Sequence, residues 1–247
     1  MMDLKKSINL MKEIPSIEEG LEKIYASVSS GQCQGCLKCC TESVNTFFVE
    51  FVDILSYLQG HPQLLESHAE KISRFFLLEM LEQMYCPFVT EEGQCAIYPV
   101  RPLPCRLFGH LEETDYNQNY DAVLKNNEDL AIYYKETYAL ILPSETINRK
   151  IPYCENFVSE QKMTRDDRDD LVDCLFSLDS RFLMNECIGF EDVNQSLITW
   201  FFKSIMSIED ASVLRVNGMR LYQEKKMDEL ELLISKISEK IIKLNSI

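Results

Sequence analysis

The sequence predicts a mostly α-helical protein: a helical domain around an irregular, cysteine-rich loop core, followed by a helical C-terminal extension. Two observations predict this class. Through most of the chain, apolar residues recur three and four positions apart, which is the spacing of the buried face of a helix. Residues 86–110 instead hold four of the eight prolines, Pro87, Pro99, Pro102 and Pro104, and these exclude a long helix.

The first half of the chain is expected to contain three helices and one short strand. Residues 16–29 have an amphipathic pattern that Ser16 is placed to cap, and residues 44–49 favour a strand. Residues 50–58 and 63–84 follow as helices. A Gly-His-Pro sequence between them is expected to end the first helix and begin the second.

Helical patterning returns after the proline-rich segment and continues to the C-terminus, with a polar link at residues 143–157. The expected helices span residues 126–140, 165–187, 190–206 and 210–244. We divide the chain into a cysteine-cluster domain, residues 1–155, and a helical C-terminal extension, residues 156–247.

The last helical segment carries a heptad seam. Its apolar residues are spaced three and four apart in alternation: Met227, Leu230, Ile234, Ile237, Ile241 and Leu244. A seam of about three heptads is short for an independent coiled coil. Two interpretations follow: the helix packs on its own domain, or the seam joins a protein partner or a second copy of the chain in a homodimer.

Charge and hydropathy narrow the classes of partner. The net charge is −15 and the sequence pI is near 4.7. An acidic protein repels phosphates, so neither nucleic acid nor an anionic membrane surface is an expected partner. The longest apolar stretches fall short of the about 20 residues that span a bilayer, and the first 20 residues lack the apolar segment of a signal peptide. We therefore expect a cytoplasmic protein with reduced cysteines.

Seven of the ten cysteines fall into two short segments, and this clustering predicts metal binding rather than disulfides or inert core thiols. The two groups are Cys33, Cys36, Cys39 and Cys40, and then Cys86, Cys95 and Cys105. In the first group, a Cys-x-x-Cys pair can bring two thiolates onto one ion through a short turn. Gly35 can adopt a positive φ in that turn and leave backbone N–H groups pointing at sulfur.

The remaining cysteines are expected to play different roles. Cys154 is isolated but lies in a loop, which makes it a candidate eighth ligand. Cys174 and Cys187 lie within helical patterns and are expected in the hydrophobic core. The adjacent Cys39 and Cys40 point differently from the backbone, so one of them would serve a second site, support the ligands or take part in redox chemistry.

Zinc and an iron–sulfur cluster both fit these cysteines. Zinc prefers closed sites of four cysteines, and seven or eight cysteines can close two of them. Three clustered cysteines and a remote Cys-Pro also resemble ferredoxin-type ligation of a [4Fe-4S] cluster, which we slightly prefer. Four thiolates leave either centre with a net charge near −2. Nearby cationic or titratable side chains are placed in sequence to offset it: Lys38, Arg101, Arg106 and His110.

At these residues the sequence resembles the CxxCxxCC family, also called YkgJ-like, a family of zinc- or iron-chelating domains. The matching pieces are Cys33–Cys40, the Cys-Pro-Phe sequence at residues 86–88, Cys95-Ala-Ile-Tyr, and Arg-Pro-x-x-Cys-Arg-x-Phe at residues 101–108. The resemblance covers roughly residues 30–155. It implies that the cysteines act together on metal and that Tyr98, Arg101 and Arg106 belong to the surroundings of the site.

A more distant resemblance, to flagellin lysine N-methylase, implies an alternative function. It rests on the double cysteine and the Cys-Pro-Phe sequence, and it would make the chain an iron–sulfur-dependent protein (lysine) methyltransferase that uses S-adenosylmethionine. The sequence departs from that enzyme at Arg-Pro-x-x-Cys-Arg. It also lacks a Gly-x-Gly-x-x-Gly turn, a P-loop and the usual hydrolase motifs. The chain is therefore expected to be a metal-binding protein first, with the enzyme as the alternative.

Overall fold

The computed structural model describes residues 2–41, 44–190 and 194–247, apart from the side chain of Asn119. Helices make up 64% of the chain, so the mostly α class is confirmed. The helices and strands are α1 (Leu4–Glu13), α2 (Pro15–Ser27), β1 (Gly31–Gln32), β2 (Asn45–Thr46), α3 (Phe48–Gly60), α4 (Pro62–Leu78), η1 (Tyr98–Val100), α5 (Leu103–Leu107), α6 (Glu113–Tyr138), α7 (Ser144–Ile147), β3 (Val158–Ser159), α8 (Arg165–Met184), β4 (Gln195–Ser196), α9 (Leu197–Lys203), α10 (Ile208–Gln223), α11 (Met227–Ile242) and η3 (Lys243–Ser246).

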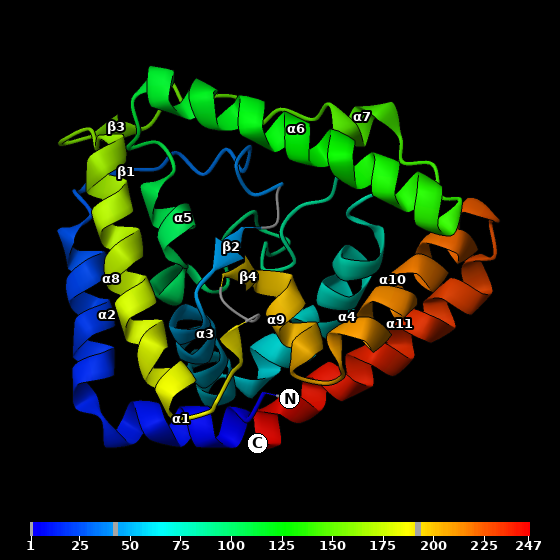
Figure 1. Cartoon of the computed structure of the whole chain (residues 1–247), viewed down its shortest axis with the longest axis horizontal. Coiled ribbons are helices and arrows are strands. Elements are labelled where there is room, and N and C mark those ends of the chain that lie inside the picture. Colours follow the sequence, from blue (N-terminus) through cyan, green and yellow to red (C-terminus); the bar gives the residue numbers. More distant parts are fainter. Residues whose placement is uncertain (1, 42–43, 191–193) are drawn as a thin grey trace.

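The helices surround the segments that carry the cysteines (Figure 1). Helices α2 and α8 lie together along one side, α1 runs along a second, and α6 crosses the edge opposite α1. Helices α10 and α11 pack on α4 along the remaining side. Helices α3, α4 and α9 lie inside this frame and supply much of the hydrophobic core.

Aromatic side chains from three helices form the centre of the core. Phe48 and Phe51 of α3 lie against Trp200 of α9, with ring centroids 5.1 and 5.9 Å from the indole, and Phe182 of α8 meets Phe48 edge-on at 5.2 Å. Trp200 is fully buried, as predicted. Buried residues from Leu4 to Leu244 join this one core, so helices on both sides of residue 155 share it. The division of the chain at residue 155 stays a prediction.

Two antiparallel strand pairs connect the first cysteine segment to the C-terminal part of the chain. Strand β1 pairs with β3, with Gly31 opposite Ser159, and β2 pairs with β4, with Asn45 opposite Ser196. The first pair immediately precedes Cys33 and the second follows Cys40. Both ends of this segment are therefore fixed by residues more than 100 positions away.

Three helix predictions need correction at their first residues, and one helix was not predicted. Helix α1 was not predicted, and α2 begins at Pro15, so Ser16 does not cap it. The helix predicted at 126–140 begins much earlier, at Glu113. The helix predicted at 190–206 begins only at Leu197, because residues 195–196 form β4; residues 191–193 lie outside the described part of the chain.

The predicted single helix at 210–244 is two helices. Helix α10 ends at Gln223 and α11 begins at Met227, and Lys225 between them takes a left-handed backbone conformation with φ of 58°. No glycine or proline marks this turn, so the local pattern gave no signal for it. The turn lets both helices bury apolar faces on α4, and this tertiary packing outweighs the local preference for one long helix.

The heptad seam packs inside the chain. Leu230, Ile234, Ile237, Ile241 and Leu244 are all at most 3% exposed, and only Met227 remains open, at 42%. Helix α11 lies along α4, where the hydroxyl groups of Ser73 and Ser238 are 3.0 Å apart. The seam is therefore covered by α4 of the same chain in this structure, as in the first of the two interpretations.

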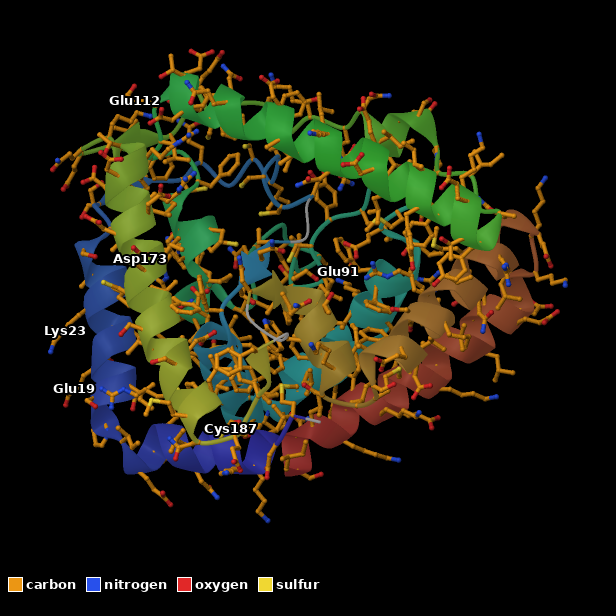
Figure 2. The ribbon with its side chains drawn as sticks, viewed as in Figure 1. Glu19, Lys23, Glu91, Glu112, Asp173 and Cys187 are labelled. Atoms are coloured by element: carbon orange, nitrogen blue, oxygen red, sulfur yellow. The ribbon has the colours of Figure 1, made fainter. Side chains whose placement is uncertain are left out.

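The two cysteines predicted for the core differ. Cys187 is fully buried where α8 meets the N-terminal helix (Figure 2), and its carbonyl accepts a hydrogen bond from the N–H of Asp3 at 3.1 Å. Cys174 is exposed, so its predicted place in the core was wrong. Helix α8 turns Leu171 and Leu175 inward and Cys174 outward.

Candidate metal centre

All eight cysteines predicted as ligands line one cavity of about 1050 Å³. They come from three separate parts of the chain: Cys33, Cys36, Cys39 and Cys40; Cys86, Cys95 and Cys105; and Cys154. The same wall contains the four residues predicted around the site, Tyr98, Arg101, Arg106 and His110. Cys174 and Cys187, which were set apart from the site, do not line it.

The turn at Gly35 shapes the first cysteine segment. Gly35 has a φ of +66°, and its N–H group lies 3.4 Å from the sulfur of Cys33. Leu37 also takes a left-handed conformation, with φ of 59°. Two residues with positive φ, separated only by Cys36, make the segment change direction sharply. An N–H group directed at sulfur stabilises the thiolate that a metal requires.

Backbone hydrogen bonds join the second cysteine segment to the first. The N–H of Cys86 donates to the carbonyl of Cys40 at 2.6 Å. A turn then brings Cys95 back beside Val89, and the N–H of Ala96 donates to the carbonyl of Phe88 at 2.8 Å. Phe88 is fully buried and anchors this loop in the core. The Cys-Pro-Phe sequence thus supplies one thiol to the cavity and one side chain to the core.

Cys105 lies on the short helix α5, and a buried carboxylate fixes the start of that helix. Oε1 of Glu50 accepts hydrogen bonds from the N–H of Leu103 at 2.6 Å and from the hydroxyl of Tyr25 at 3.1 Å. Its Oε2 accepts from the N–H of Phe47 at 3.0 Å, at the start of α3. Glu50 therefore joins the first turns of α3 and α5, and burial raises its pKa to about 7.

Sequence reasoning did not identify Glu50 as part of the site. The sequence did contain one indication of a buried carboxylate: Glu50 is an acidic residue inside the apolar stretch that forms α3, and the other residues of such a stretch are expected in the core. Asp179 of α8 is a second buried carboxylate at the same helix end, where it accepts from the N–H groups of Phe48 at 2.9 Å and Val49 at 2.7 Å. Unlike Glu50, Asp179 has no hydrogen bond to the segment that carries Cys105.

Arg106 holds the loop before α5 in place. Its Nε donates to the carbonyl of Arg101 and its Nη2 to the carbonyl of Pro99, both at 2.7 Å. The guanidinium group also stacks on the ring of Tyr25, 3.8 Å from the centroid. The second arginine of the Arg-Pro-x-x-Cys-Arg sequence is thus directed largely at the backbone and at Tyr25.

Arg101 is placed differently. Its guanidinium group lies 3.8 Å from the centre of the Tyr98 ring, and Tyr98 is 52% exposed. No described carboxylate forms an ion pair with Arg101. The first arginine of the Arg-Pro-x-x-Cys-Arg sequence is therefore held by the face of an aromatic ring and not by an ion pair with a described carboxylate.

His110 is a buried wall residue, 3% exposed. Its Nδ1 lies 2.9 Å from the hydroxyl of Ser29 and 2.8 Å from that of Ser159, and its ring meets Phe157 edge-on. Burial lowers its pKa, which favours the neutral ring. These contacts fix His110 beside the cavity as a support for the strand pair β1–β3.

The thiols in the cavity influence one another electrostatically. Burial, followed by the charges of Cys86, Cys95 and Cys39, raises the pKa of Cys105 well above its ordinary value. Burial raises the pKa of Cys86 to about 12. Cys105 is accessible to solvent, and it lines the cavity. Without a cation, these thiols hold their protons at neutral pH.

The thiols line the cavity without converging on one point. Within the described part of the chain, no three His, Cys, Asp or Glu side chains are grouped closely enough to hold a single ion. The cavity is also far larger than one ion requires, since a water molecule occupies only about 30 Å³. Soft thiolates select zinc, copper(I) or iron–sulfur centres. The donor set therefore fits a thiolate-bound metal centre.

A mostly helical protein with eight thiols around one cavity belongs to the class of candidate metal-binding proteins. Residues 32–124 match the CxxCxxCC family, described as "Putative zinc- or iron-chelating domain", which confirms the resemblance predicted from the cysteines. The matched segment includes seven of the eight cysteines and ends before Cys154. Neither the curated proteins nor the solved structures include a match to the chain. Among the described helices, none is both long enough and apolar enough to cross a membrane.

Proposed function

We propose that the chain is an iron–sulfur protein that holds a [4Fe-4S] cluster in this cavity. The observation that carries the proposal is the convergence of eight thiols on a single cavity of about 1050 Å³. A cluster spans several ligands that need not meet at one point, whereas a zinc ion requires four donors around one centre. The match to a zinc- or iron-chelating family supports metal binding and leaves both metals open.

The proposed cluster ligands are Cys39, Cys86, Cys95 and Cys105. Burial is the main cause of the raised pKa values of Cys86 and Cys105; the charges of Cys95 and Cys39 add to it at Cys86, and those of Cys86, Cys95 and Cys39 add to it at Cys105, as expected for neighbouring thiols. The remaining four cysteines, Cys33, Cys36, Cys40 and Cys154, complete the wall; they would exchange with these ligands or bind a second ion. Lys38 and Arg106 would offset the negative charge of the bound cluster.

Purification under anaerobic conditions tests the proposal. The protein is expected to contain about four iron and four acid-labile sulfide per chain, with the broad visible absorption of an iron–sulfur cluster. Zinc at stoichiometric amounts without sulfide would contradict the cluster and assign the cavity to zinc. A fully folded, metal-free protein whose cysteines all react freely with an alkylating reagent would contradict metal binding altogether.

Metal affinity should rise with pH. The thiols of Cys86, Cys95 and Cys105 have raised pKa values, so each must lose a proton before it can bind metal. Each proton released is expected to increase the apparent affinity roughly tenfold per pH unit below those pKa values. Competition of zinc against a chromophoric chelator between pH 6.5 and 8.5 measures this slope. A pH-independent affinity would show that the bound ligands are not these thiols.

The size of the cavity leaves room for the substrates of one alternative function, an iron–sulfur-dependent protein (lysine) methyltransferase. Small-molecule sites occupy about 300–1,000 Å³, so the cavity has room for a substrate or S-adenosylmethionine beside a metal. In that case S-adenosylmethionine should change the visible or electron paramagnetic resonance spectrum of the reconstituted protein. An unchanged spectrum at saturating S-adenosylmethionine would contradict the methyltransferase function and leave metal binding as the remaining proposal.

We also propose that the protein is cytoplasmic, where its thiols stay reduced, and that it has no nucleic-acid partner.

A further inference from the structure

The cavity has more space than its thiols and a metal centre fill. Its volume of about 1050 Å³ is at the upper end of the range of small-molecule sites. Its wall also extends beyond the cysteines, to Tyr98 and Arg101 on one side and to Tyr153 on another. A second occupant beside the metal is therefore sterically allowed.

The charge of the cavity wall is opposite to that of the protein. The chain has a net charge of −15, yet the cavity is lined by Lys38, Arg101 and Arg106 and by one described carboxylate, that of Glu155. Apart from the thiols, the wall therefore carries a net positive charge, which favours an anion there over the rest of this acidic surface.

Of these cations, Arg101 is the one whose guanidinium group is placed to bind an anionic ligand. The Nε and Nη2 groups of Arg106 donate hydrogen bonds to the carbonyls of Arg101 and Pro99. The guanidinium of Arg101 stacks instead on Tyr98 and forms no ion pair with a described carboxylate. Stacking fixes the plane of the group while its edge keeps five N–H donors, a fork that matches the oxygens of carboxylate or phosphate.

We infer that Arg101, held by Tyr98, binds the carboxylate or phosphate group of a small molecule that shares the cavity with the metal. The inference rests on the proposed function for the use of this cavity as a metal site. The remainder of the ligand lies toward the thiols, where the apolar part of the wall includes Ile97 and Pro104. The two anion classes share the same recognition by the guanidinium fork, and the experiment separates them.

The test uses the metal-loaded full chain with two probes, carbon-13-labelled acetate and inorganic phosphate, at constant ionic strength. Binding is measured by broadening of the carbon-13 and phosphorus-31 resonances of the probes. The Arg101→Gln variant is expected to weaken binding about tenfold or more, because a charge-assisted pair is lost. Arg181→Gln is the matched control, since Arg181 is an exposed arginine of α8 outside the cavity. It should bind like the unmodified chain.

The outcomes separate this inference from the proposed function. Broadening of acetate alone assigns a carboxylate ligand, and broadening of phosphate alone assigns a phosphate ligand. Retention of metal without broadening of either probe overturns the inference and leaves the proposed function in place. Loss of metal from Arg101→Gln, with equal broadening before and after the change, also overturns it, because Arg101 would then only balance the charge of the metal centre. Metal content of the same samples tests the proposed function separately.

Discussion

Cys105→Ser should remove most of the bound metal and destabilise the part of the chain around the cavity. Cys105 lines the cavity and is one of the four proposed ligands, together with Cys39, Cys86 and Cys95. Binding of a structural zinc contributes on the order of 10 kcal/mol to folding, and loss of one ligand forfeits a large part of such a contribution. Cys39→Ser, Cys86→Ser and Cys95→Ser change the other three proposed ligands and are expected to act in the same direction.

Two cysteines serve as controls for these variants. Cys174→Ser changes an exposed thiol of α8 outside the cavity, and Cys187→Ser changes a buried one. Both should retain full metal content; only Cys187→Ser should lose stability, by roughly 1–3 kcal/mol. Metal per chain and the midpoint of thermal unfolding measure both effects. Equal metal loss from Cys105→Ser and Cys174→Ser would refute the assignment of the cavity as the metal site.

Glu50→Gln should weaken metal binding although Glu50 is not proposed as a ligand. Its carboxylate accepts the N–H of Leu103, at the start of the helix that carries Cys105, and the hydroxyl of Tyr25, on which Arg106 stacks. Glutamine keeps the shape but turns one acceptor into an NH₂ group, which leaves a buried N–H donor unpaired. We expect a loss of about 2 kcal/mol of stability and a lower metal affinity, because α5 loses its fixed position.

Asp179→Asn is the matched control for Glu50→Gln. Asp179 is an equally buried carboxylate that accepts two N–H groups at the start of α3, and burial raises its pKa to about 7, as for Glu50. It should lose comparable stability and keep the metal affinity of the unmodified chain. Chelator competition at a temperature where both variants are folded compares them. If both lose affinity equally, Glu50 acts only through general stability and does not position Cys105.

The chemistry of the candidate site could be predicted from the sequence because thiols at short spacing are specific. Cys33 to Cys40 and the Cys-Pro-Phe sequence indicated shared metal binding before any fold was known, and all eight predicted cysteines line one cavity. The mostly α class followed from the apolar spacing, which local helical geometry dictates. Even the turn at Gly35, with its N–H near the sulfur of Cys33, followed from the conformational freedom of glycine.

The tertiary structure alone decided which residues support the thiols and where the chain turns. Glu50 contacts Leu103, 53 positions away, and β1 pairs with β3 across more than 120 residues; no local pattern encodes such pairings. The turn at Lys225 arises because α10 and α11 both pack on α4, and Cys174 is exposed because helix α8 turns its other face to the core. The spacing of residues in the sequence indicates which side chains can bind metal and which local conformation they adopt. The contacts that each of these side chains makes are decided by long-range packing, which depends on the whole fold.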